Sequence, residues 1–182
     1  MNLGAGDDGL TLFPNSGRIS KASVELCAVG DLDELSATMG VVAAALPQCC
    51  AEIQPQLVEV QRALLRIGSF CAGCSEDSFT RVMKEALAGL DRWIAVLDDE
   101  LPALQCFVLP SGHGAACAAH VARAVCRRAE RSFVAMVEAC AEEANGGAYA
   151  VMAYLNRLSF FLFSLARLVN FREGMVESFE SG

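Results

Sequence analysis

The chain has 182 residues, of which 54% are hydrophobic and 20% are charged. This length fits one domain, and so much apolar material is enough for a packed core, which excludes a chain that is disordered throughout. The 14 Lys and Arg against 22 Asp and Glu give a net charge of -8. A nucleic acid is itself a polyanion and is therefore not an expected partner.

The first eight residues contain neither a basic nor an apolar segment, so we expect no secretory signal and a cytoplasmic location. The apolar run over residues 158–166 is bracketed by Arg157 and Arg167. It is shorter than the ~20 residues that a membrane helix needs, so no membrane association is expected. Nine cysteines are an odd number and suggest a reducing compartment. Four of them lie in apolar patterns and are predicted to be buried, namely Cys27, Cys117, Cys126 and Cys140.

Residues 1–30 are rich in Gly, Asp, Ser and Asn and keep no period, which predicts a long loop or hairpin. A helical period begins at Asp31, where Asp31 and Glu34 resemble a capping box, and Pro47 ends this helix. A second helix is predicted over about 51–70 and a third over about 80–100.

A loop over residues 106–114 precedes the fourth predicted helix, whose apolar residues recur at three and four from Ala115 to Cys140. The segment 145–147 then breaks the chain before a last helix from Tyr149 to about Phe171. The middle of that helix is apolar all round, which predicts burial on every side, either centrally or in a subunit interface. The sequence thus predicts an all-α, five-helix bundle in a single domain over 1–182, with an N-terminal region (1–30), a bundle (31–172) and a tail (173–182).

The fourth predicted helix carries a polar face opposite its apolar stripe, made of Arg123, Arg127, Glu130 and Arg131. With Arg128, these arginines are four of only 14 basic residues in an acidic chain. Guanidinium groups are suited to a bidentate grip on phosphate oxygens. The alternative is a solvated helix face held by pairs of residues one turn apart, and the pattern alone does not decide between the two.

Residues 4–9 match the letters G-x-G-x-x-G, but no strand precedes them and no helix follows, which excludes a Rossmann dinucleotide site. What remains is a loop whose backbone N–H groups could approach an anion, with Arg18 and Lys21 just downstream. A simple turn in a mobile terminus is the alternative interpretation.

The acidic, histidine and cysteine residues of the chain give weaker indications of function. Capping explains the carboxylates of Asp31 and Glu34, whereas Asp33 faces another side and could pair with an arginine of the fourth helix. Only two histidines occur, and no Glu-x-x-His, so a ferritin-like di-iron bundle lacks its ligands. The lone Cys-x-x-Cys at 71–74 has no second pair, so neither a zinc site nor a thioredoxin-type role is expected.

The last predicted helix contains three polar residues within its most apolar part, Asn156, Arg157 and Ser159. Buried polar groups need partners, which either a ligand or a structural hydrogen bond would supply.

Taken together, these segments resemble the PduO-type ATP:corrinoid adenosyltransferases. The resemblance is carried by five blocks in order: residues 6–9 with 17–21, Glu25 with 30–36, 107–112, 122–131 and 154–159. It implies a five-helix bundle that assembles as a homotrimer with active sites between neighbouring subunits. It also implies transfer of the 5′-deoxyadenosyl group of ATP to the Co(I) of a corrinoid such as cobalamin, with release of triphosphate. Mg²⁺, a reductase and a cobalamin-dependent acceptor enzyme are the further partners implied.

The resemblance also assigns roles to residues. Arg127 and Arg131 would stabilise the departing triphosphate, with Glu130 orienting them, because charge develops on the leaving group. Phe107 would crowd the lower face of the corrin and displace its axial ligand, and Asp33 and Arg123 would form an ion pair that shapes the corrinoid pocket. Cobalt is the nucleophile, so neither a protein nucleophile nor a protein-bound metal is implied. The ATP contacts implied are Gly6, Asp7, Thr11, Arg18, Lys21, Arg127, Arg128, Glu130, Arg131 and Asn156.

The chain departs from the family in its N-terminal loop, which usually reads Thr-Lys-Thr-Gly-Asp where residues 3–7 read Leu-Gly-Ala-Gly-Asp. A lysine and two hydroxyls that would contact the triphosphate are therefore missing. Ser36 stands where many members have Asn, and Phe160 where many have Asp. These losses keep open a second hypothesis, a non-catalytic relative that carries or senses a corrinoid or a nucleotide. A purely structural helical oligomer is a third.

Overall fold

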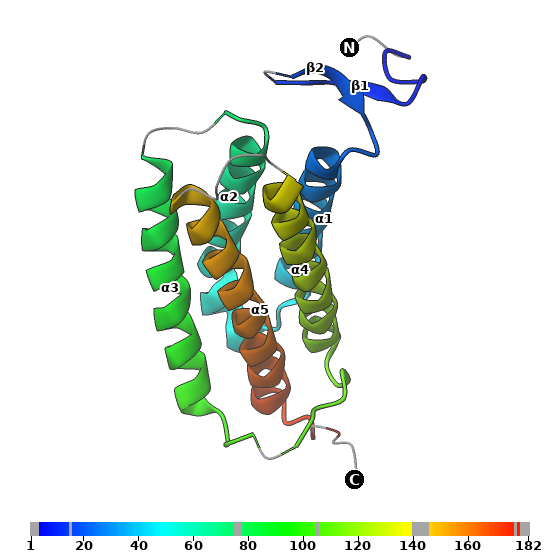
Figure 1. Ribbon diagram of the computed structural model, residues 1–182. Coiled ribbons are helices and arrows are strands. Elements are labelled where there is room, and N and C mark those ends of the chain that lie inside the picture. Colours follow the sequence, from blue (N-terminus) through cyan, green and yellow to red (C-terminus); the bar gives the residue numbers. More distant parts are fainter. Residues whose placement is uncertain are drawn as a thin grey trace.

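The computed structural model describes residues 4–14, 16–74, 78–104, 106–139, 146–176 and 178. Long helices lie side by side in one bundle, and a small hairpin projects beyond the end at which the first helix begins (Figure 1). Within the described residues the elements are β1 (Leu10–Phe13), β2 (Gly17–Ser20), α1 (Val24–Ala45), the short 3-10 helix η1 (Gln48–Ile53), α2 (Gln54–Cys71), α3 (Phe79–Glu100), α4 (Gly114–Ala139) and α5 (Gly146–Arg172).

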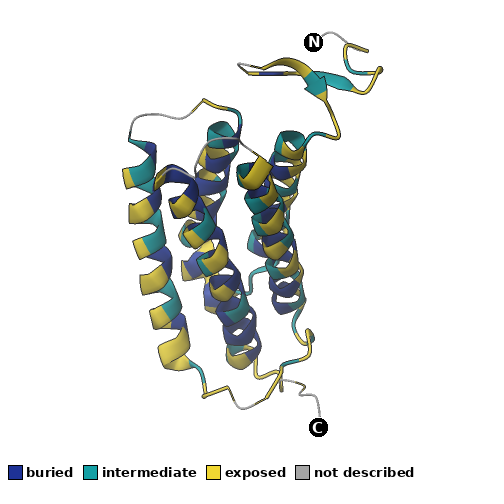
Figure 2. Cartoon of the chain, in the orientation of Figure 1, coloured by how far each residue is buried: buried dark blue, intermediate teal, exposed yellow. Residues whose placement is uncertain are grey.

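The bundle is built by neighbouring helix pairs. α1 packs on α2 and α4, and α5 packs on α3 and α4. Each helix turns its apolar stripe inward, where Figure 2 colours the ribbon dark blue for buried residues, and large residues such as Leu57, Phe133 and Phe161 are fully buried. The predicted helical bundle is confirmed. β1 and β2 pair antiparallel, with Leu10 opposite Ser20 and Phe13 opposite Gly17, so the N-terminal segment forms the hairpin that was one of its two predicted forms.

α1 begins seven residues earlier than predicted. Ser23 is its N-cap, and the Ser23 hydroxyl accepts a hydrogen bond from the backbone N–H of Leu26 at 3.4 Å. The predicted capping box at Asp31 and Glu34 is therefore wrong. The helix extends upstream because Ala28 continues the buried stripe of Leu32 and Leu35, and this packing outweighs the glycine and polar residues of the segment.

α5 is the central helix, and its length and composition alone would let it cross a membrane. In the bundle 61% of its most apolar window is buried, as expected of a core helix between α3 and α4. One face stays exposed along the helix within one chain, at Tyr149, Phe160 and Phe171, so the chain alone does not bury the helix on every side, and burial in a subunit interface stays a prediction. Gly146 and Gly147 belong to the helix instead of breaking the chain, while residue 145 lies outside the described residues.

The cysteines differ in their surroundings. Cys126 is buried, which raises the pKa of its thiol to about 12, and Cys117 is partly buried. Cys27 is exposed, contrary to prediction, because the helix that carries it starts earlier and turns this position outward. Cys140 lies outside the described residues.

Candidate functional site

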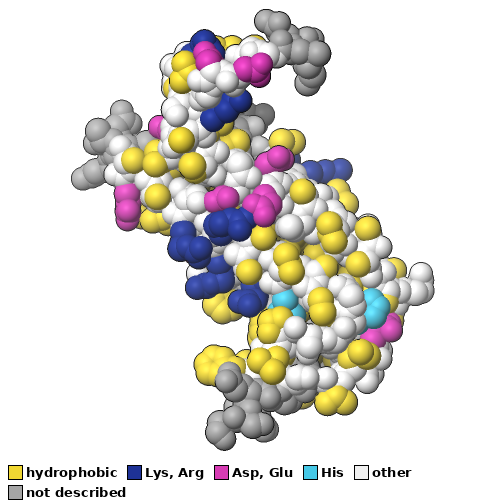
Figure 3. Space-filling model, turned by 90° about the vertical axis from the view of Figure 1, so that its right-hand side faces the viewer, with side chains coloured by type: hydrophobic (Ala, Val, Ile, Leu, Met, Phe, Trp, Pro, Cys, Tyr) yellow, Lys and Arg dark blue, Asp and Glu magenta, His cyan; other side chains and the backbone are white. Residues whose placement is uncertain are grey.

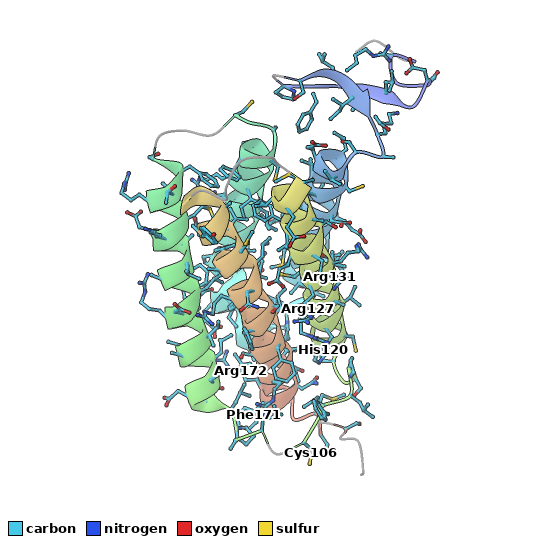
Figure 4. The ribbon with its side chains drawn as sticks, in the orientation of Figure 1. Cys106, His120, Arg127, Arg131, Phe171 and Arg172 are labelled. Carbon is cyan, nitrogen blue, oxygen red and sulfur yellow. The ribbon has the colours of Figure 1, made fainter. Side chains whose placement is uncertain are left out.

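A row of arginines follows one side of α4. Arg123, Arg127 and Arg131 stand on successive turns, while Ala122, Val125 and Ala129 of the same helix are buried. Figure 3 shows Lys and Arg side chains gathered in one patch on this side of the molecule, and Figure 4 places Arg127 and Arg131 along the middle of α4. The predicted polar face of the fourth helix is thus present.

Most of these guanidinium groups have no partner within the part of the chain that the structure describes. Arg131 Nη1 donates to the backbone oxygen of Arg127 at 3.1 Å. The guanidinium groups of Arg123 and Arg127 form no hydrogen bond or ion pair with described residues, and Arg123 Nε is buried without a hydrogen-bond partner there. A buried donor left unpaired is costly, so an acceptor that reached Arg123 Nε from a ligand or another chain would be favourable.

Arg128 behaves differently from its neighbours because it turns toward α1. Its Nε donates to Asp31 Oδ1 at 3.2 Å, and its guanidinium group also pairs with Glu34. Ser132 Oγ donates to Asp31 Oδ2 at 2.5 Å. Asp31 and Glu34 therefore join α1 to α4 instead of capping a helix, and they raise the pKa of Arg128. Its role toward ATP stays a prediction.

Asp33 lies on another side of α1. It is exposed and lines a groove of about 450 Å³ between α1 and α2, whose other walls include Val29 and Leu64. Among the described residues Asp33 has no hydrogen-bond or ion-pair partner, so it does not meet an arginine of α4 within one chain.

Each of the three polar residues predicted in the middle of α5 contacts a described residue. Asn156 Nδ2 donates to Glu130 Oε1 at 3.3 Å, which ties α5 to the arginine face of α4. Glu130, predicted to orient Arg127 and Arg131, thus holds Asn156 in this structure. Arg157 pairs with Asp91 of α3 at 2.6 Å, and Ser159 Oγ donates to the backbone oxygen of Asn156 at 2.7 Å.

The N-terminal hairpin gathers the other predicted ATP contacts. Lys21 Nζ donates to the backbone oxygen of Gly6 at 2.7 Å, and a Cβ at Gly6 would lie 2.9 Å from that ammonium group. Arg18 pairs with Asp8 at 2.7 Å, and this contact lowers the pKa of the Asp8 carboxyl group. Thr11 lies on β1 of the same hairpin.

The hairpin and the arginine face are nevertheless apart. Figure 1 shows the hairpin beyond the end of the bundle, whereas Arg127 and Arg131 lie midway along α4 (Figure 4). A single chain therefore does not bring the two halves of the predicted ATP site together.

Phe107 lies on the loop between α3 and α4 and is 86% exposed. The loop itself is anchored. Asn170 of α5 donates from Nδ2 to Ser111 O at 2.9 Å and accepts at Oδ1 from the His113 N–H at 2.9 Å. Leu109 N–H donates to the backbone oxygen of Ser178 at 2.8 Å. A large apolar ring held outward on a fixed loop is suited to contact an apolar ligand face.

Sequence reasoning missed Asn170. The signal was a polar residue in the buried stripe of an apolar helix, where it is only 2% exposed. Such a group must have partners, but the sequence did not indicate that they would be the Phe107 loop. No group of three or more His, Cys, Asp or Glu that could hold a metal ion is found among the described residues.

Comparison with known proteins identifies the family. The family model of cobalamin adenosyltransferase matches residues 1–169, and the chain belongs to that family. It is 38% identical over 165 residues to a cobalamin adenosyltransferase of Cupriavidus metallidurans, covering 91% of this chain and 85% of that protein. It is 34% identical over 172 residues to a corrinoid adenosyltransferase of Bacillus subtilis, covering 93% and 86%.

Solved structures of PduO-type enzymes are similar to this chain over its whole length. A variant of the PduO-type ATP:corrinoid adenosyltransferase from Lactobacillus reuteri, complexed with cobalamin and ATP, superimposes with a TM-score of 0.87 at 27% identity over 100% of this chain and 99% of that one. Another variant of the same enzyme, complexed with ATP, gives a TM-score of 0.83 at 26% identity over the full length of both chains.

Proposed function

We propose that this chain transfers the 5′-deoxyadenosyl group of ATP to the Co(I) of a corrinoid, forming adenosylcobalamin when the corrinoid is cobalamin. The observation that carries the proposal is the row of guanidinium groups on α4, those of Arg123, Arg127 and Arg131, that have no carboxylate partner among the described residues in a chain of this family. Arginine side chains without carboxylate partners, in a chain of net charge -8, are suited to a polyanionic ligand.

The chemistry needs little more from the protein than position and charge. Cobalt attacks C5′, the C5′–O bond breaks, and the electron pair leaves with the triphosphate. Negative charge therefore grows on the triphosphate, and fixed cations at that place lower the barrier. Arg127 and Arg131 supply them, and Asn156, held by Glu130, contacts the nucleotide beside them.

Mg²⁺ is the proposed companion of ATP. The described residues contain no cluster of protein ligands for it, which fits an ion held mainly by phosphate oxygens and water, with one or two carboxylates at most. Asp7 is exposed in the turn that precedes β1 and is the carboxylate we assign to it. The ion would share the charge of the triphosphate.

The active site is proposed to form between subunits of a homotrimer. Among the described residues Arg123 on α4 has no partner for a buried nitrogen and Asp33 in the α1–α2 groove has no cation, yet one chain keeps them apart. Docking the α4 face of one subunit on the α1–α2 groove of the next satisfies both. It also brings a neighbour's hairpin, with Gly6, Asp7, Thr11, Arg18 and Lys21, to the arginines.

Phe107 is proposed to lie under the corrin ring. There it would displace the lower axial ligand, which makes the cobalt easier to reduce. Its loop is fixed from behind by Asn170, so the ring can occupy that place without folding back.

A non-catalytic corrinoid or nucleotide carrier remains the second candidate. One observation favours it: Gly4 and Ala5 offer no lysine or hydroxyl to the triphosphate. Residue 3 lies outside the described residues. Lys21 closes on the loop at Gly6 and is the cation that can compensate.

The location and the other partners follow from the chemistry. Co(I) requires an electron donor, hence a reductase, and adenosylcobalamin is itself a cofactor, hence an acceptor enzyme. Eight cysteines within the described residues are free thiols. This agrees with the cytoplasmic, reducing location that we propose.

An anaerobic single-turnover assay tests the function. The protein is mixed with Co(I) cobalamin, ATP and Mg²⁺, and the visible spectrum follows formation of adenosylcobalamin. Arg127→Ala is expected to slow the reaction about 100-fold or more, because it removes a charge aimed at the leaving group. Arg92→Ala, which removes an exposed arginine of α3, is the matched control and should react at the wild-type rate.

Two outcomes would count against the enzyme. A wild-type protein that binds Co(II) cobalamin but forms no product with ATP would support the carrier. A reaction slowed equally by Arg127→Ala and Arg92→Ala would remove the arginine face from the mechanism.

A further inference from the structure

A pocket of about 600 Å³ lies between α3 and α5, outside the arginine face. This volume is in the range of small-molecule sites, about 300–1,000 Å³. One wall is α5 with Phe160 and Phe163, and the other is formed by Ile94 of α3 and the loop from Leu101 to Leu104. The pocket is therefore mainly apolar and partly aromatic.

The pocket lies near both proposed ligand contacts, the one to the nucleotide and the one to the corrinoid. Phe160 is one turn along α5 from Asn156, the proposed nucleotide contact. Leu104 belongs to the loop that leads to Phe107, the proposed corrinoid contact. A ligand held at both places would pass the mouth of this pocket.

The aromatic wall is fixed and available. Phe160 is 52% exposed although its neighbours Ser159 and Phe161 are buried. Phe163 is held from behind by His120 of α4, with ring centroids 6.1 Å apart in an edge-on contact. An exposed aromatic ring beside a second, fixed one is a stacking surface for a flat group.

The polar groups of the pocket do not demand a charged ligand. Arg157 pairs with Asp91 at 2.6 Å, and Ser164 Oγ donates to Asp98 Oδ1 at 2.6 Å. Arg167 Nη2 donates to Pro102 O at 3.0 Å. Since each of these side chains already has a hydrogen-bond or ion-pair partner within the chain, the pocket fits a neutral aromatic group better than a phosphate.

We infer that this pocket receives the aromatic base of the corrinoid's nucleotide tail after Phe107 has displaced it from the cobalt. The Co–N bond breaks with both electrons remaining on the base nitrogen, so the cobalt keeps its oxidation state. Stacking on Phe160 then stabilises the displaced base and favours the four-coordinate cobalt. This inference rests on the proposed function and adds a preference for complete corrinoids over those without the tail.

The test compares Co(II) cobalamin with Co(II) cobinamide, which has the same ring but no nucleotide tail. Dissociation constants are measured anaerobically by visible absorption, with ATP present. The wild type is expected to bind cobalamin about tenfold more tightly, the size of one good aromatic stacking contact. Phe160→Asp and Phe160→Ala should bring the two constants within about twofold of each other.

Val96→Ala is the control, since Val96 is 70% exposed on α3 and lies outside the pocket lining. It should keep the tenfold preference. Equal affinity of the wild type for both corrinoids would overturn the inference and leave the proposed function standing. A Phe160→Asp variant that loses affinity for ATP instead would assign the pocket to adenine, which also overturns it. Failure to bind either corrinoid would remove the proposed function and this inference together.

Discussion

Gly112 and Asn170 show how single residues position the Phe107 loop. Gly112 has φ +100°, and a Cβ there would lie 2.2 Å from Asn170 Oδ1. The missing side chain lets Asn170 reach both Ser111 and His113. Backbone conformation and hydrogen bonding at this loop thus depend on one glycine and one amide.

Replacing Gly112 by Ala is expected to lower the free energy of unfolding by at least about 2 kcal/mol. The change adds strain at positive φ and expels the Asn170 amide. Gly114→Ala is the control, because nothing lies within 4 Å of a Cβ there, and it should be neutral. Urea denaturation of both variants checks this. Equal stability of the two would show that the loop adapts without cost.

The sequence predicted which face of the helix the arginines occupy but not which residues they contact. Spacing alone places Arg123, Arg127 and Arg131 on one face of a helix. Spacing does not show that Arg128, one position further round, meets Asp31 and Glu34 of α1. That contact depends on how α1 and α4 pack.

Among the elements, the C-terminal end of α5 is tied to two others by Arg172. Its guanidinium group donates to Glu100 at the end of α3 at 2.8 Å, pairs with Glu52 of η1, and donates to the backbone oxygen of Cys49 at 2.7 Å. Arg172 lowers the pKa of both carboxyl groups. One side chain thus closes the end of the bundle from which the Phe107 loop leaves.

Arg172→Met should destabilise the protein by about 1–2 kcal/mol at pH 7, since charged hydrogen bonds are lost from partly exposed carboxylates. The contribution is complete above pH ~5, where these groups are ionised even when unfolded, and fades as the pH falls through their lowered native pKa. The difference in melting temperature between wild type and variant should therefore shrink between pH 5 and pH 3.

Arg62→Met provides the comparison, because among the described residues Arg62 pairs with Glu59 of the same helix, at 2.5 Å. Arg62→Met should lower the free energy of unfolding at pH 7 by less than Arg172→Met does. If the difference in melting temperature between the wild type and Arg172→Met stayed constant down to pH 3, this result would contradict the ion-pair explanation.

Over the whole molecule, charge is divided between faces that do not meet in one chain. No carboxylate of the described residues pairs with Arg123, Arg127 or Arg131 of α4, and the α1–α2 groove offers Asp33. The closed ring of three subunits that we propose would place each face against its complement. The hairpin, which projects from the bundle (Figure 1), then has a neighbour to contact.

Charge reversal tests this assembly. Asp33→Arg should raise the dissociation constant of the oligomer at least tenfold, because a desolvated ion pair becomes a repulsion. Combining it with Arg123→Asp in the same chain should restore assembly, as measured by sedimentation. Asp99→Arg, on the exposed side of α3, should leave the mass unchanged. A double variant that stays monomeric would argue against the pairing.

The helices, the polar face of α4 and the family can be predicted from the amino-acid sequence, because periodicity and motif spacing are local properties of the chain. The start of α1, the exposed face of α5 and the bonds from Arg128 to α1 and from Glu130 to α5 depend on how the helices pack. These depend on contacts between residues far apart in sequence, such as Arg128 with Asp31 and Asn170 with Ser111. Packing free energy outweighs local propensity at such places, so no local pattern records them.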